Sequence, residues 1–343
     1  MLPEFFTPQD AWMDQVGRIY ALIQQTQASE AAAPHRLELR RATRINSVHS
    51  STAIEGNRLS LEQVTAVVNG HVVFGPEKDV LEVQNAWAAY EELDSFDPYS
   101  VDDLLRAHAA LTQGLITQSG RFRSTDVEIV NDAGEVLHTG SRWAKVPLLV
   151  TELLEWAATT TAHPLIASSA THYLIEHIHP FQDGNGRIGR LWQTLMLSRW
   201  NPLFAWMPTE TLIARDQAGY YMALQASHSP EIDAAPFITF MLGVIEAALQ
   251  DYQASVVVTV VEDVVVKDAA LTLIREDPRI SAARLATHLG MSARQAQRII
   301  KSLRDTGILT REGSPKSGRW IVRDGQKVPE ELPSRTGDHS AHF

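Results

Sequence analysis

Apolar residues recur every three or four positions along most of the chain, which is the pattern of amphipathic helices. The clearest case is residues 8–27, where Trp12, Val16, Ile19 and Ile23 form one stripe. The same spacing predicts helices over residues 37–68 (one or two), 82–93, 101–115, 147–160, 164–177, 186–200, 220–227 and 235–252. We therefore expect a mainly α-helical fold.

Two stretches depart from this pattern. In residues 120–140, strand-forming Val127, Ile129 and Val136 flank the turn residues 131–134, which predicts a short β-hairpin. Residues 251–266 are ambiguous, because their valine run favours a strand by propensity. Helical patterns flank this run and no turn residue divides it, so we predict a helix there.

The C-terminal region has a pattern of its own. Ser281 and Ser292 are expected to cap two short helices joined at Gly290, which is a helix-turn-helix arrangement. Two predicted strands, 308–310 and 320–322, flank a turn-rich segment typical of a wing. The module resembles a winged helix-turn-helix.

Charge separates this module from the rest of the chain. Residues 264–323 carry 12 Lys and Arg against 5 Asp and Glu, although the whole chain has a net charge of −11. Arg294, Gln295, Arg298 and Lys301 lie on the second predicted helix and could meet DNA. A protein contact is the alternative, because many winged helices bind proteins and basic residues are often simply solvated.

Composition narrows the setting. The chain has no cysteine, which excludes disulfides and thiolate metal sites and suits a reducing cytosol. The N-terminus lacks a signal-peptide pattern, and the most apolar stretch, 256–266, is too short to span a bilayer and is interrupted by Glu262 and Asp263. We expect a cytoplasmic protein that makes no membrane contact.

Residues 179–190, which read HPFQDGNGRIGR, concentrate the candidate chemistry. Gly184 and Gly186 permit close approach of a ligand to the backbone, at the start of a predicted helix whose N–H groups favour anions. Arg187 and Arg190 are three apart, so both guanidinium groups face the same anion site.

The same loop supplies a base and a metal ligand. His179 titrates near neutral pH and can accept a proton from a hydroxyl, while Asp183 is a hard oxygen ligand for Mg²⁺. The group His172, His177 and His179 raises the alternative of zinc, but the segment lacks an HExxH arrangement and the chain has no cysteine. No GxxxxGK[ST] phosphate loop is present.

This segment resembles the signature of the Fic family, HxFx[DE]GNGRxxR, and the likeness covers about residues 1–250. His179, Phe181, Asp183, Gly184, Asn185, Gly186, Arg187 and Arg190 fill its fixed positions. The resemblance implies a Fic-type helical bundle with a short β-hairpin flap, followed here by the C-terminal winged-helix domain.

The resemblance also implies roles. His179 would deprotonate a protein hydroxyl that attacks ATP, Phe181 would anchor the loop, and Asp183 would hold Mg²⁺ at the phosphates. The remaining contacts to ATP would come from Gly184, Asn185 and Gly186 at the α-phosphate, Arg187 at the β-phosphate, Arg190 at the γ-phosphate, and Tyr220 or Tyr221 at the adenine.

Two further implications concern the target and the reaction. The flap, 120–140, with Val127, Glu128 and Ile129, would align a target segment by adding a strand edge to it. Doc relatives, which transfer phosphate, carry a lysine at the place of Gly186 and lack the second arginine. Gly186 and Arg190 therefore favour AMP transfer.

Residues 51–56, which read STAIEG, resemble the inhibitory motif of the family, [ST]xxxE[GN]. Ser51, Glu55 and Gly56 fill it, within an inhibitory helix expected at about residues 44–58. Glu55 would pair with Arg190 as the γ-phosphate of ATP otherwise does.

These inferences divide the chain into an N-terminal helical region (1–100), a Fic core (101–252), a winged helix (253–323) and a disordered tail (324–343). The expected function is an autoinhibited protein adenylyltransferase that moves AMP from Mg-ATP to a Ser, Thr or Tyr hydroxyl, including its own. The alternatives are a nucleotide-sensing DNA-binding regulator and a de-AMPylase that uses the same site. The target protein stays open, as does a homodimer.

Overall fold

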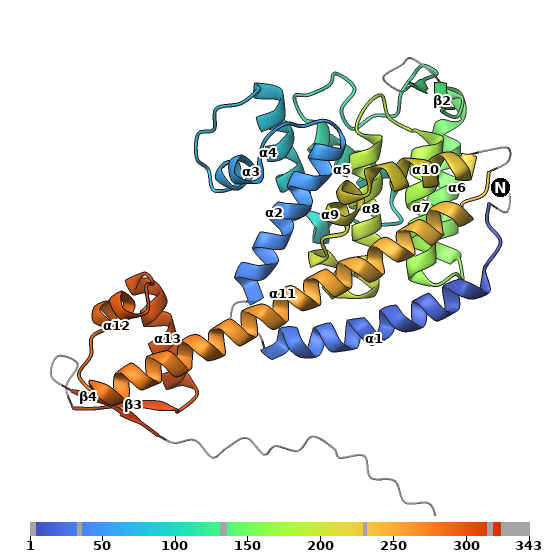
Figure 1. The fold of residues 1–343 in the computed structure, drawn as a ribbon. Coiled ribbons are helices and arrows are strands. Elements are labelled where there is room, and N and C mark those ends of the chain that lie inside the picture. The colour runs from blue at the N-terminus through green and yellow to red at the C-terminus, as the bar shows by residue number, and fades with distance from the viewer. Residues whose placement is uncertain (1–4, 33–35, 131–135, 229–231, 314–317, 324–343) are drawn as a thin grey trace, which may run out of the picture. The chain divides into compact units, whose positions relative to one another are not determined.

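A computed structural model describes residues 5–32, 36–130, 136–228, 232–313 and 318–323, and it confirms a mainly α-helical fold (Figure 1). Its α-helices are α1 (Asp10–Ala32), α2 (Arg36–Ile54), α3 (Leu61–Val68), α4 (Glu77–Glu91), α5 (Val101–Thr112), α6 (Val146–Thr159), α7 (Pro164–Ile178), α8 (Asn185–Trp200), α9 (Thr209–Arg215), α10 (Gln217–His228), α11 (Ala235–Glu276), α12 (Ala282–His288) and α13 (Ala293–Asp305). Short 3-10 helices are η1 (Leu93–Ser95), η2 (Trp143–Lys145) and η3 (Pro202–Trp206).

The described strands form two antiparallel hairpins, β1 (Glu128–Val130) with β2 (Val136–Thr139), and β3 (Leu309–Glu312) with β4 (Arg319–Val322). The predicted hairpin within 120–140 is therefore present, although its turn at 131–135 lies outside the described residues. The expected break at residues 33–35 and the expected disordered tail, 324–343, lie outside them too.

The chain forms two compact units, Met1–Val257 and Val258–Phe343. Helix α11 begins in the first unit and ends in the second, and it runs unbroken through residues 251–266, as predicted. Among the helices described, none is both long and apolar enough to cross a membrane.

Helices α7 and α8 form the centre of the first unit and pack extensively against each other. Almost every side chain of α7 from Leu165 to Ile175 is buried, and so are those of α8 from Arg187 to Ser198. Burying each large aliphatic side chain contributes about 1.5–3 kcal/mol. This core fixes both ends of the loop that joins the two helices.

The segment predicted to be inhibitory differs from its expected form. Helix α2 ends at Ile54 rather than near residue 58, and Gly56 follows with φ of +89°. A left-handed glycine just after the last helical residue is a common way to end a helix. Glu55 is therefore the first residue beyond the helix. Helix α9 and η3, which lie within residues 202–215, were not predicted.

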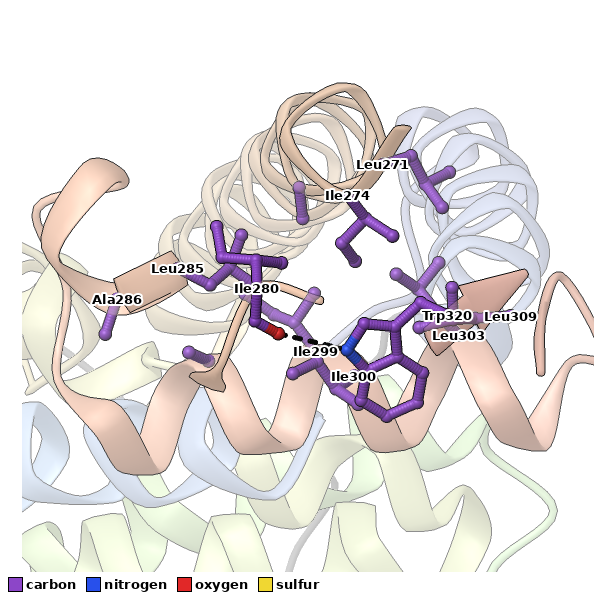
Figure 2. Close-up of a cluster of buried hydrophobic side chains, with 12 residues drawn as sticks. Leu271, Ile274, Ile280, Leu285, Ala286, Ile299, Ile300, Leu303, Leu309 and Trp320 are labelled. Atoms are coloured by element: carbon purple, nitrogen blue, oxygen red, sulfur yellow. Dashed lines mark hydrogen bonds between the residues drawn. The ribbon is translucent and has the colours of Figure 1, made fainter. Parts of the chain in front are cut away.

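The second unit has its own small core, drawn in Figure 2. Ile280, Leu285, Ile299 and Leu303 pack there with Trp320, whose indole Nε1 donates a hydrogen bond to the Ile280 carbonyl oxygen at 3.1 Å. Ser281 and Ser292 cap α12 and α13 as predicted, the second in a reciprocal capping box with Gln295. The end of α11, the two short helices and the hairpin together form a winged helix-turn-helix.

Candidate active site

The loop between α7 and α8 has two residues in the left-handed backbone region. His179, at the C-terminal cap of α7, has φ of 53°, and Gly184, at the N-terminal cap of α8, has φ of 86°. The described part of the chain has no other non-glycine residue with positive φ. Such strain in a non-glycine residue persists only where the surroundings enforce it, which is typical of functional sites.

Polar side chains hold the loop in this shape. Both polar atoms of the Asn185 side chain bind the Phe181 backbone, each at 2.9 Å, so this side chain shapes the loop. The His108 ring stacks on the buried Phe181 ring with centroids 3.7 Å apart. His108 Nδ1 accepts from the Gly120 N–H, and its Nε2 donates to the Asp183 carbonyl oxygen at 2.9 Å.

Arg123 supports the strained residue, and sequence analysis missed it. Its Nε donates to the His179 carbonyl oxygen at 2.7 Å, and its other guanidinium nitrogens reach the carbonyl oxygens of Thr125, Ile178 and Ser141. One buried guanidinium thus joins the loop to the residues on both sides of the hairpin. Only its place in the GRFRS run, ahead of the strand-forming residues of the predicted hairpin, could have indicated this role.

Arg190 contacts the segment that was predicted to be inhibitory, residues 51–56. Its Nη2 lies 2.7 Å from Glu55 Oε1 and 3.0 Å from the Ser51 carbonyl oxygen, while its Nε donates to Ser51 Oγ at 3.1 Å. The Arg190 side chain is 1% exposed and that of Glu55 is 28% exposed. Burial alone would lower the pKa of Arg190, but the Glu55 carboxylate raises it above its ordinary value.

The Glu55 carboxylate also lies directly over the start of α8. A Cβ added at Gly186 would overlap it, so a larger residue at this position would displace the carboxylate. The first N–H groups of a helix have no partner within the helix and attract anions. In this structure, a carboxylate therefore stands at the anion site predicted from the sequence.

Arg187 has an acidic partner that sequence analysis did not identify. Its Nη1 lies 2.5 Å from Oε1 of the buried Glu82 on α4, and its Nη2 lies 3.5 Å from Asp183 Oδ1. Asp183 Oδ1 also accepts from the Gly184 N–H at 2.6 Å, and its side chain is 47% exposed. A half-exposed carboxylate beside the helix start fits a hard cation such as Mg²⁺ that bridges to phosphates.

His179 carries a neutral imidazole at pH 7. Burial lowers its pKa to about 4, with only partial compensation from the Glu176 carbonyl oxygen. That oxygen lies 3.4 Å from Nδ1, so the proton belongs on Nδ1 and the lone pair on Nε2. A neutral ring with a free lone pair is the form that a general base requires.

The two tyrosines proposed for the adenine differ. Tyr220 is 1% exposed, and its hydroxyl lies 3.1 Å from His172 Nε2 and 3.2 Å from Glu176 Oε1. Its neighbour Tyr221 is 46% exposed. Of the pair, only Tyr221 has a ring surface open to a ligand.

The hairpin stands beside His179. Glu128 pairs with Thr139 and Ile129 with His138, with an irregularity between Ile129 and Val130. Val127 precedes β1 and accepts a hydrogen bond from the Gly140 N–H at 3.1 Å. A Cβ added at Gly140 would lie 3.3 Å from the His179 Cβ, which brings the base of the hairpin into contact with the predicted catalytic residue.

Acidification should destabilise this core. Burial lowers the pKa of His108 to about 4 and that of His172 to about 3, below the unfolded value near 6.5. Between these values the unfolded chain binds protons that the folded chain does not, so stability falls as pH falls below 6.5. Between pH 7 and pH 5, each of these two histidines should lower the free energy of unfolding by about 2 kcal/mol.

Urea unfolding at pH 7 and pH 5 measures this loss. In His172→Gln, which has no ring to protonate, the pH dependence should shrink by the contribution of one histidine. Equal stability of the wild-type chain at both pH values would contradict the prediction.

Comparisons with known proteins agree on both units. The Fic/DOC family profile matches residues 98–197, and a winged helix-turn-helix DNA-binding profile matches residues 269–310. A solved structure of a Fic family protein from Desulfovibrio desulfuricans G20 is 36% identical, with a TM-score of 0.70. The match covers 95% of this chain and 100% of that one.

Curated relatives are larger. A protein adenylyltransferase Fic from Nematostella vectensis is 29% identical over 61% of this chain and 48% of its own length. Protein adenylyltransferase fic-1 from Caenorhabditis elegans is 29% identical over 60% of this chain and 40% of its own length. The chain thus spans about half the length of the curated relatives it matches, or less.

Proposed function

Since the chain belongs to the Fic family, we propose that it is a protein adenylyltransferase, which moves AMP from ATP to a protein hydroxyl. The observation that carries the proposal is the loop that joins a neutral imidazole, His179, to the open end of α8 with Arg187 and Arg190 on that helix. The adenylyltransferase names of the relatives in Nematostella and Caenorhabditis support the same reaction.

In the proposed reaction, ATP lies with its phosphates across the start of α8. His179 Nε2 takes the proton of the target hydroxyl, whose oxygen attacks the α-phosphorus. The bond from that phosphorus to the bridging oxygen breaks, and pyrophosphate leaves with the electron pair. The N–H groups of α8 and the two guanidinium groups stabilise the charge that develops on the phosphates.

Asp183 would hold the Mg²⁺ that accompanies ATP. Its carboxylate is half-exposed. It accepts a hydrogen bond from the Gly184 N–H at the start of α8 and lies 3.5 Å from Arg187 Nη2. When bound, Mg²⁺ supplies positive charge against the phosphate oxygens. The remaining contacts come from the chain, with Arg187 at the β-phosphate and Arg190 at the γ-phosphate.

We infer that the structure represents an inhibited state. The Glu55 carboxylate lies against Arg190 and above Gly186, which is the place that we assign to the γ-phosphate. Ile54, the last residue of α2, accepts a hydrogen bond from Gln217 of α10 at 3.0 Å, which fixes the inhibitory segment from a second side. Transfer would require Glu55 to move away from Arg190.

Incubation of the full chain with Mg-ATP, followed by mass spectrometry, tests the proposal. A protein mass increase equal to one adenylyl group (AMP less water), on the chain itself or on an added target, would support it. A phosphate adduct would contradict AMP transfer, and ATP binding without any adduct even after loss of Glu55 would favour the nucleotide-sensing alternative. Release of AMP from a modified protein would favour the de-AMPylase alternative.

For the second unit, we propose DNA binding through the exposed face of α13. Ala296, Ile299 and Leu303 of α13 face the small core, whereas Arg294 and Lys301 are exposed. Arg298 is also exposed, and Gln295 uses its side-chain oxygen in the cap of α13. The winged helix-turn-helix DNA-binding profile over residues 269–310 supports this assignment.

This proposal predicts a salt-dependent affinity for duplex DNA. Neutralising phosphates releases counterions, so the binding constant should fall steeply as salt rises. Arg294→Ala and Lys301→Ala should each reduce the slope of log K against log salt by about 1. Mobility-shift titrations over a salt series measure the slope.

Arg18→Ala is the matched control, because Arg18 is exposed but lies in the first unit, paired with Glu246. An unchanged slope in both α13 variants, or the same change in Arg18→Ala, would contradict the assignment and favour a protein partner.

A further inference from the structure

Three histidines that are far apart in the sequence lie close together beside the β1–β2 hairpin. His138 comes from β2, His177 from the last turn of α7 and His228 from the end of α10. Each ring offers one nitrogen, and these three nitrogens all lie within 4.8 Å of one another. Among the described residues, no other group of three potential ligands is so arranged.

The closest pair already has the spacing of metal ligands. His177 Nδ1 and His228 Nδ1 face each other at 3.2 Å. Two imidazole nitrogens bound tetrahedrally to Zn²⁺ at 2.0–2.1 Å lie about 3.3 Å apart. The His138 and His228 rings are stacked with centroids 4.0 Å apart, so the His138 ring would have to turn out of the stack for its nitrogen to join the other two.

The proton of His138 lies where a metal site requires it. His138 Nε2 donates to the His177 carbonyl oxygen at 2.8 Å, which leaves the lone pair of this ring on Nδ1. A ligand histidine typically donates its second nitrogen to a backbone carbonyl in this way. The Tyr173 hydroxyl donates to the Ser227 carbonyl oxygen at 2.6 Å, so its oxygen accepts from His228 Nδ1 at 3.1 Å, and a bound metal ion would displace that proton.

The rings are also in the protonation state that binds metals. Burial lowers the pKa of His177 to about 4 and that of His228 to about 3, and it lowers the pKa of His138 as well. All three imidazoles are therefore neutral at pH 7, as coordination requires. The group includes no carboxylate, so it suits a transition metal rather than Mg²⁺ or Ca²⁺.

We propose that His138, His177 and His228 bind a transition metal ion such as Zn²⁺, separately from the Mg-ATP site, with a fourth position open to water or to Tyr173. His177 lies two residues before His179, and His138 lies in the hairpin. A bound ion would fasten the hairpin to α7 beside the proposed base. Metal binding itself does not depend on the transfer reaction.

Titration of the untagged, metal-free full chain with Co²⁺ tests the site. Tetrahedral Co²⁺ gives visible absorption bands that the free ion lacks, so the probe reports coordination without any assay of transfer. We expect one Co²⁺ per chain, displaced by one Zn²⁺. His138→Ala, His177→Ala and His228→Ala should each weaken Zn²⁺ binding by at least ~100-fold, since removing a ligand exceeds the effect of removing its supporting partner.

Two controls separate this site from others. His71→Ala removes an exposed histidine elsewhere, and Asp183→Ala removes the proposed Mg²⁺ ligand; both should leave Zn²⁺ binding unchanged. His138→Ala alters a short hairpin outside the helical core, so its folding is the least at risk, and circular dichroism checks it. Absence of the Co²⁺ bands, or full binding in His138→Ala, would overturn the proposal whether or not the chain transfers AMP.

Discussion

Glu55→Gly should raise the rate of AMP transfer by this chain on the order of 10- to 100-fold. This is the change that typical coupling free energies between a regulatory contact and a site produce. The substitution removes the carboxylate that pairs with Arg190 and covers the start of α8. It leaves the two Ser51 contacts of Arg190, at 3.0 and 3.1 Å, so the guanidinium should stay in place to receive a phosphate.

Glycine is tolerated at position 55 because Glu55 follows the last residue of α2 and lies outside the helix. The matched control is Glu92→Gly, since Glu92 likewise follows the last residue of a helix, α4, and is exposed. Transfer of label from α-³²P-ATP to protein measures the rate. If Glu55→Gly matched the wild type, or if Glu92→Gly gave the same gain, the Glu55–Arg190 contact would not be inhibitory.

Much of the fold follows from local patterns in the sequence. The amphipathic helices, both serine caps of the winged helix and the strand-forming residues of the hairpin depend on neighbours in the chain, so periodicity and capping predict them. Helix α9 was missed because its seven residues are too few to establish a period. The end of α2 was misplaced because Gly56 alone determines it.

The site was predictable to the extent that its chemistry lies in one continuous segment. The loop from His179 to Arg190 carries its residues in order, and the glutamate expected to reach Arg190 does so. Arg123 and Glu82 were missed because they act across the fold, on a backbone carbonyl and on a buried guanidinium. The histidine cluster was missed for the same reason, since its members come from three separate elements.

His177 illustrates the difference between residues that are neighbours in the sequence and residues that are neighbours in the fold. Sequence proximity grouped it with His172 and His179, and that grouping did not favour zinc. In the structure, His172 is buried and bonded to Gln193 at 2.7 Å, while His177 turns toward His228. Only the packing of α7 against the hairpin and α10 brings the three ligand candidates together.

His179→Asn in the Glu55→Gly background should lower transfer by ~10²–10⁴-fold, the usual contribution of a general base. We choose asparagine because residue 179 has a φ of 53°, and asparagine tolerates this region better than other non-glycine residues. Alanine would lose the base but would also strain the loop. If both variants lose activity equally, the loss comes from the missing imidazole rather than from a distorted backbone.

ATP affinity distinguishes a catalytic role from a binding role for His179. No phosphate contact is assigned to this side chain, so the Mg-ATP affinity of His179→Asn should stay within about threefold of that of its parent. Its turnover rate should fall strongly, because only interactions made in the transition state are lost. Isothermal titration with ATP, beside the labelling assay, measures both quantities. Retained transfer in His179→Asn would assign the proton to another group, such as Glu176, whose pKa burial raises to about 7.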